Sequence, residues 1–201
     1  MAHTASQAKP KLTYAISYGF LSGPALSRQL RKDLRGFGYE EARGIGQADI
    51  IIAHSAGCWL VPKAASAKLL IHVGMPLAQA HPHETFKAAR QQNIRAFIRH
   101  FHVWRGLVIG FYSLYYALAQ PVRNRNIVRD AKHARIATQL GNVQTVFIAN
   151  RDDPWPQPDK LQTYVEKQDW AFIGLPGSHN DIWEYPERYA AIIDHYARLL
   201  A

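Results

Sequence analysis

The chain has 201 residues, of which 48% are hydrophobic and 11% aromatic, so it is long and apolar enough for one domain with a sizeable core. Its net charge of +9 favours anionic partners, but no nucleic-acid-binding motif accompanies the charge, and we expect no nucleic acid partner. A single cysteine, Cys58, excludes an internal disulfide. Residues 1–11 are polar and lack a signal-peptide core, which predicts a flexible tail and a cytoplasmic protein.

Strand and helix patterns alternate along most of the chain. Predicted strands cover residues 12–17, 48–53, 68–73, 143–149 and 170–175. Predicted helices cover residues 25–35, 56–67, 126–140, 158–167 and 186–200, with a helical insertion over 77–126 and a short strand or helical turn within 39–47. This alternation predicts an α/β fold, a three-layer sandwich with a mostly parallel central sheet.

The stretch from Ile50 to Cys58 combines a buried strand with a serine on a sharp turn. Ser55 has small neighbours at Ala53, Ala56 and Gly57, as the strained strand-to-helix turn called the nucleophile elbow requires. Ala53 stands where the usual G-x-S-x-G pattern has its first glycine. The pentapeptide alone is equally compatible with an ordinary turn that happens to contain a serine.

Two other predicted strands end in residues that complement a serine nucleophile. Asp152 and Asp153 follow the strand 143–149, and His179 follows the strand 170–175. Carboxyl ends of parallel strands lie at one edge of a sheet, so these groups should meet Ser55 there. Imidazole takes the serine proton and a carboxylate orients the imidazole. Each residue alone has an ordinary explanation, a turn cap or a loop histidine, but their joint order favours catalysis.

Three motifs carry a family resemblance: Ala-His-Ser-Ala-Gly at 53–57, Asp-Asp-Pro-Trp at 152–155 and Gly-Ser-His-Asn at 177–180. With them the chain resembles the α/β-hydrolase superfamily, and in particular the compact serine hydrolases of the retinoblastoma-binding protein 9 type. The resemblance implies a reduced α/β-hydrolase fold over 12–201, with Ser55 as nucleophile and His179 as base. It implies Asp153 as the acid, with Asp152 as the alternative.

The resemblance also implies an oxyanion hole made of the backbone N–H groups of Ala56 and Phe20. Tyr18 replaces the histidine usual before the glycine of that loop, a change that backbone donors tolerate. The implied function is hydrolysis of small carboxylic esters or thioesters through an acyl-enzyme, without a cofactor or metal. The alternative is a non-catalytic protein on a hydrolase scaffold that binds a lipid or a protein partner.

The insertion, about 77–140, occupies the place where such hydrolases carry a helical cap. Its segment 106–119 has no charge, and Leu107, Phe111, Leu114 and Leu118 fall on one helical face. Two interpretations stay open. The helix is either a lid that lines an acyl pocket and touches an anionic membrane surface peripherally, or a helix packed into the core or a homodimer interface. The histidines at 81, 83, 100 and 102 lack a zinc-binding spacing, so we expect no metal.

Overall fold

The computed structural model describes residues 12–19, 21–62, 65–76, 103–130, 143–153, 155 and 158–200, without the side chains of 103–106 and 127–130. Its centre is a six-stranded sheet in the order β2-β1-β3-β4-β5-β6. Every neighbouring pair is parallel. The strands are β1 (Thr13–Ser17), β2 (Glu40–Glu41), β3 (Ile50–His54), β4 (Leu69–Val73), β5 (Gln144–Asn150) and β6 (Ala171–Leu175). The predicted α/β fold class with a parallel sheet is confirmed.

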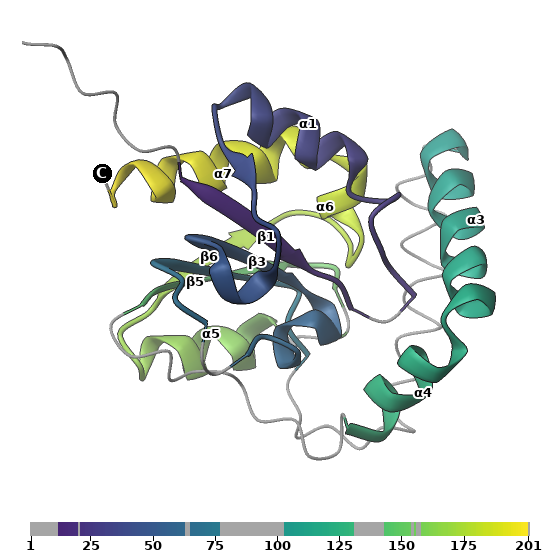
Figure 1. Cartoon of the computed structure of the whole chain (residues 1–201). Helices are drawn as coiled ribbons and strands as arrows, with labels where there is room; N and C mark the ends of the chain where they lie inside the picture. The colour runs from purple at the N-terminus through teal and green to yellow at the C-terminus, as the bar shows by residue number, and fades with distance from the viewer. Residues whose placement is uncertain are drawn as a thin grey trace, which may run out of the picture.

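Helices cover both faces of the sheet (Figure 1). The helices, with short 3-10 turns labelled η, are α1 (Arg28–Gly36), η1 (Ile45–Gln47), η2 (Ser55–Trp59), α3 (Val103–Ala119), α4 (Pro121–Asp130), α5 (Pro158–Glu166), α6 (Asp181–Glu184) and α7 (Pro186–Arg198). Helices α1 and α7 pack together on one face, and α5 and η2 lie on the other. The two helical layers and the sheet form the predicted three-layer sandwich.

The isoleucine run in β3 shows why the sheet is covered on both sides. Ile50 and Ile52 pack into the core shared with α1 and α7, whereas Ile51 points to the opposite core beneath α5. All three side chains are fully buried. Side chains alternate across a strand, so a continuous apolar run fits only a strand with both faces buried.

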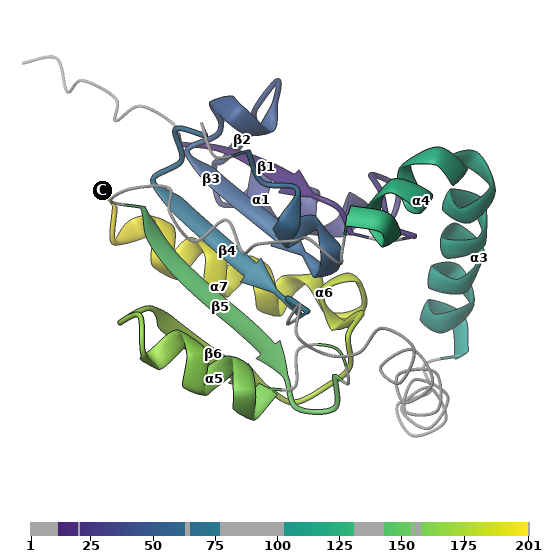
Figure 2. The same ribbon diagram turned by 90° about the horizontal axis from the view of Figure 1, so that it is seen from below.

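Helices α3 and α4 stand apart from the three layers. Figure 2 shows the arrowheads of β4 and β5 pointing toward the side of the molecule on which these two helices lie. The helical structure is interrupted between them, near Pro121, as the sequence predicted, and α4 begins at that proline. The remainder of the predicted insertion, 77–102 and 131–140, lies outside the described residues. No described helix combines the length and apolar character needed to cross a membrane.

One predicted helix is wrong. Residues 56–67 form no long helix, because the turn after β3 is only the five-residue η2, from Ser55 to Trp59. Pro62 cannot donate the hydrogen bond that a continuing helix needs at its position, which is consistent with this early end. The short segment predicted at 39–47 contains both expected alternatives, a two-residue strand β2 and the turn η1.

Candidate active site

Ser55 sits at the end of β3 in a strained backbone conformation. Its φ of 54° is left-handed, a region that non-glycine residues seldom occupy. Gly57 lets the turn pack against β1, since a Cβ there would lie 2.2 Å from the Ser17 carbonyl oxygen. Gly19 lies on the other side, where a Cβ would come within 2.8 Å of the Ser55 Cβ. This crowded turn has the properties of a nucleophile elbow.

A hydrogen-bonded chain links Ser55 to a histidine and a buried carboxylate. His179 Nε2 lies 2.8 Å from Ser55 Oγ, and His179 Nδ1 lies 2.6 Å from Asp153 Oδ2. The Asp153 side chain is fully buried, and its other oxygen accepts the Trp155 N–H at 3.0 Å. Asp152 is exposed, so the structure brings Asp153, not Asp152, against the histidine.

The loop that carries His179 is held by neighbours that sequence reasoning missed. Asn150, at the end of β5, donates from its side chain to the Ser178 carbonyl and accepts from the Tyr189 hydroxyl at 2.9 Å. Asp181 accepts from both the backbone N–H and the hydroxyl of Ser178, each at 2.8 Å. A tyrosine hydroxyl and two buried polar side chains therefore determine where the histidine stands.

His54, the residue before Ser55, also contacts the loop that carries His179. Its Nε2 lies 3.0 Å from the His179 carbonyl oxygen, which can only accept, so Nε2 carries the proton. Burial, helped by the nearby His179, lowers the pKa of His54 to about 3 and keeps the ring neutral. The nucleophile motif leaves this position unspecified, so only its place beside Ser55 could have drawn attention to it.

Gly74, directly after β4, stands behind the bond between Asp153 and His179. Its φ is 56°, and a Cβ there would lie 3.0 Å from Asp153 Oδ2 and 3.1 Å from His179 Nδ1. A side chain would crowd both partners and would strain the backbone as well. The carboxyl ends of β3, β4, β5 and β6 thus all contribute to one site.

Of the two predicted oxyanion donors, the structure describes Ala56. Ala56 follows the nucleophile and is buried, and its nitrogen would lie 2.9 Å from a Cβ built on Gly19. The second predicted donor, Phe20, lies outside the described residues, between the described Gly19 and Leu21. The loop after β1 therefore packs at Gly19 directly against the turn that carries Ser55.

Cys58, the other nucleophilic side chain near Ser55, is unsuited to attack. It is fully buried, and its Sγ donates a hydrogen bond to the Ala53 carbonyl at 3.2 Å. Burial raises the pKa of the Cys58 thiol well above its ordinary value. The thiolate needed for reaction is therefore disfavoured.

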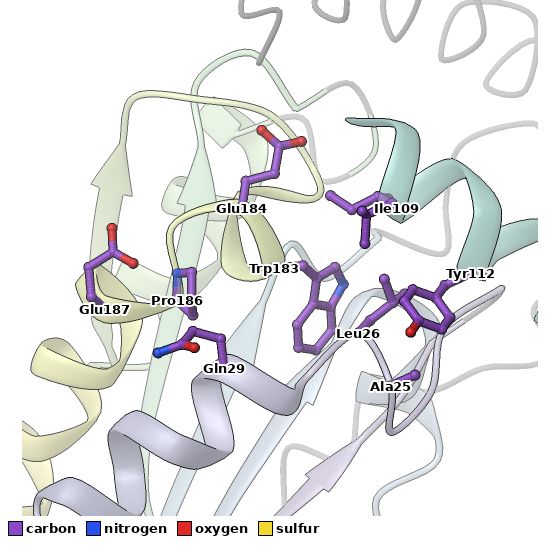
Figure 3. A pocket seen from close by; sticks show the side chains of 10 residues that line it. Ala25, Leu26, Gln29, Ile109, Tyr112, Trp183, Glu184, Pro186 and Glu187 are labelled. Carbon is purple, nitrogen blue, oxygen red and sulfur yellow. The ribbon is translucent and has the colours of Figure 1, made fainter. Parts of the chain in front are cut away.

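A cavity of about 380 Å³ lies between α1, α3 and the α6–α7 segment. Figure 3 shows Leu26, Ile109 and Tyr112 around the indole of Trp183, with Glu184 and Glu187 at the margin. The Trp183 ring also meets the His54 ring edge-on, with ring centroids 5.0 Å apart, so the cavity wall lies next to the residue before Ser55. Ser55, Asp153 and His179 do not line this cavity.

No protein-family model matches the sequence, and no match to a curated protein was found. Solved structures do match across most of the chain. A thermophilic esterase from Thermogutta terrifontis has a TM-score of 0.66 and 14% identity, with 93% of this chain and 89% of that chain covered. An epoxide hydrolase from Vigna radiata has a TM-score of 0.62 and 12% identity, with 94% and 92% covered. The chain has the α/β-hydrolase fold.

A third match with this fold is the thioesterase domain from the curacin biosynthetic pathway. Its TM-score is 0.57 at 14% identity, with 92% of this chain and 91% of that chain covered. Identities this low support the fold alone, because one fold hosts many activities. Within the α/β-hydrolase fold, the chemistry of this chain has to be argued from Ser55 and its neighbours.

Proposed function

We propose that the chain is a serine hydrolase that cleaves carboxylic esters or thioesters, of the compact type that its motifs resemble. The observation that carries the proposal is the continuous chain from Asp153 through His179 to Ser55, with hydrogen bonds of 2.6 and 2.8 Å. The serine, base and acid come from separate strand ends and meet in the order that acyl transfer needs. This arrangement favours acyl chemistry over the epoxide opening named for one structural neighbour.

The proposed mechanism assigns one task to each group. His179 Nε2 takes the Ser55 proton as the oxygen attacks the acyl carbonyl, and Asp153 stabilises the imidazolium through Nδ1. The Ala56 N–H, with a donor from the loop after β1, stabilises the oxyanion. His179 then protonates the leaving group, and water activated by the same imidazole releases the acyl group from Ser55.

Substitution of Ser55 tests this proposal. Ser55→Ala should lower the hydrolysis of short p-nitrophenyl esters by at least about 10⁴-fold while the melting temperature changes little. A fluorophosphonate probe should add its mass to the wild type and not to the variant. Comparable hydrolysis by both proteins would refute the proposal. If hydrolysis depends on Ser55, a series of esters of increasing acyl-chain length, tested on the wild type, would define the substrate class.

A second function is favoured by a separate observation, the exposed apolar face of α3. We propose that this face binds the surface of an anionic membrane. The exposed fractions are 67% for Phe111, 61% for Leu114 and 75% for Leu118, and the face continues to Val122 at 71%. An apolar stripe this open is uncommon on a protein that contacts only water. The net charge of +9 suits anionic headgroups.

Vesicle sedimentation tests the membrane proposal independently of catalysis. Phe111→Glu combined with Leu118→Glu should abolish binding to vesicles that contain phosphatidylserine. Phe37→Glu, at an exposed apolar residue after α1, should leave it unchanged. Wild-type binding should weaken as salt rises and be absent with neutral lipid. If the wild type does not sediment, or if it dimerises through this face and the double variant is monomeric, the proposal is wrong.

A further inference from the structure

The loop between β1 and α1 is described at Tyr18, Gly19 and Leu21 to Ala25, and these residues are here called the oxyanion loop. Gly19 places it against Ser55 and Ala56, at distances that leave no room for a side chain. Leu21, two residues on, has a left-handed φ of 52°, which is unfavourable for a residue with a γ-branched side chain. Strained conformations of this kind persist only when surrounding contacts enforce them.

Arg123 of α4 supplies two of these contacts. Its Nη2 donates to the Tyr18 carbonyl at 2.5 Å, and its Nη1 donates to the Ser22 carbonyl at 3.3 Å. The guanidinium therefore joins both sides of the turn that contains Gly19 and Leu21. The guanidinium is partly buried, and this burial lowers the pKa of Arg123. Figure 1 shows the chain between β1 and α1 running toward α3 and α4.

Asn124 and Tyr116 extend the same connection. The buried Asn124 side chain accepts the Leu21 N–H at 3.4 Å and donates to the Tyr116 carbonyl at 2.9 Å. The Tyr116 hydroxyl accepts the Ala25 N–H at 2.9 Å. The Tyr116 ring also fills the space over Gly23, where a Cβ would lie 2.5 Å from it. Polar groups of α3 and α4 thus contact the oxyanion loop along most of its length.

We propose that Arg123 and Asn124 are positioning residues that hold the oxyanion loop against Ser55 and so couple the α3–α4 helix pair to the acyl-transfer step. The inference rests on the proposed function, because it assumes that this loop provides an oxyanion donor. The arginine bonds keep the loop carbonyls turned toward α4. The asparagine bond stabilises the strained backbone of Leu21. Movement of α4 would then change the geometry of the oxyanion hole directly.

Substitutions on α4 distinguish a positioning role of Arg123 from a purely structural one. Arg123→Gln should lower kcat for a p-nitrophenyl ester about 10- to 100-fold with KM changed less than about threefold, because a misplaced donor affects the transition state. Arg123→Lys should recover part of kcat, since one ammonium can serve one of the two carbonyls. Arg125→Gln, at an exposed residue of the same helix, is the control and should match the wild type.

Hydrogen exchange supplies the second readout. In Arg123→Gln, amide exchange of a peptide covering 18–25 should rise at least about tenfold, while that of β3 and β4 stays at the wild-type level. A normal kcat in Arg123→Gln, unchanged exchange in 18–25, or an equal rise throughout the sheet would overturn the inference. Absence of Ser55-dependent hydrolysis in the wild type would instead overturn the proposed function, so the two failures are distinguishable.

Discussion

His72, in the middle of β4, predicts an unusual dependence of stability on pH. The residue is fully buried, its ring stacks on Phe147 at 4.7 Å, and neither ring nitrogen has a hydrogen-bond partner among the described residues. Burial lowers the pKa of His72 from 6.5 to about 3. Between these two values the unfolded chain binds a proton that the folded chain does not. The free energy of unfolding therefore falls as the pH falls below 6.5.

The size of the effect follows from the pKa difference. A pH of 5 lies 1.5 units below the ordinary pKa of 6.5 that His72 has in the unfolded chain. At about 1.36 kcal/mol per pH unit, protonation of His72 in the unfolded chain alone lowers the free energy of unfolding by about 2 kcal/mol. His72→Leu eliminates this loss. It also removes an unsatisfied buried imidazole, which adds about 1–3 kcal/mol at any pH. His54 contributes a similar acid loss to both proteins, so it cancels in the comparison.

Urea unfolding of the wild type and His72→Leu at pH 8 and pH 5 measures this difference. The stability gap between the two proteins should widen by about 2 kcal/mol at pH 5, with unchanged m-values. A gap of the same size at both pH values would refute the reasoning, because it would mean that His72 is protonated equally in the folded and unfolded chains.

Two predictions concern the proposed catalytic groups. Asp153→Asn should lower ester hydrolysis by about 10⁴-fold, while Asp152→Asn at the exposed neighbour should change it less than threefold, and the reverse order would show that Asp152 is the acid. Gly74→Ala should lower kcat about 10- to 100-fold, because its Cβ would crowd the bond between Asp153 and His179. The same variant should lose about 1–2 kcal/mol of stability from its left-handed backbone, and normal kcat and stability together would contradict the steric argument.

The sheet could be predicted from the sequence because its strands carry a strong local signal. The isoleucines of β3 are buried on both faces, so their identity alone indicates a parallel, doubly covered strand. The helix predicted over 56–67 is wrong because a local signal was misleading there. Alanines favour helix there, but the turn η2 is held by contacts with β1, among them the 2.8 Å bond from the Ser17 hydroxyl to the Gly57 carbonyl. Tertiary contacts overrode local propensity.

The choice between Asp152 and Asp153 could not be made from the sequence, because both follow the same strand. The structure separates them through contacts with the neighbouring loop. The Asp152 N–H donates to the Gly177 carbonyl at 3.0 Å, and the Asp153 N–H donates back to the Asn150 carbonyl at 3.1 Å. This turn leaves Asp152 exposed and directs the Asp153 carboxylate toward His179. One residue of register, set in part by the contact of Asp152 with Gly177 in the loop after β6, decides which carboxylate faces His179.

The two small residues that flank Ser55 at a distance of two positions, Ala53 and Gly57, differ in how strictly their sites require glycine. Ala53 lies in the regular part of β3, paired with Ser17 of β1 and His72 of β4, and the strand accommodates its methyl group in the buried core. A methyl group at Gly57 would instead overlap the Ser17 carbonyl oxygen at 2.2 Å. The departure from the usual motif at Ala53 is therefore structurally neutral, whereas Gly57 is required by the approach of β1. For this fold, the glycine after the serine is the more informative of the two.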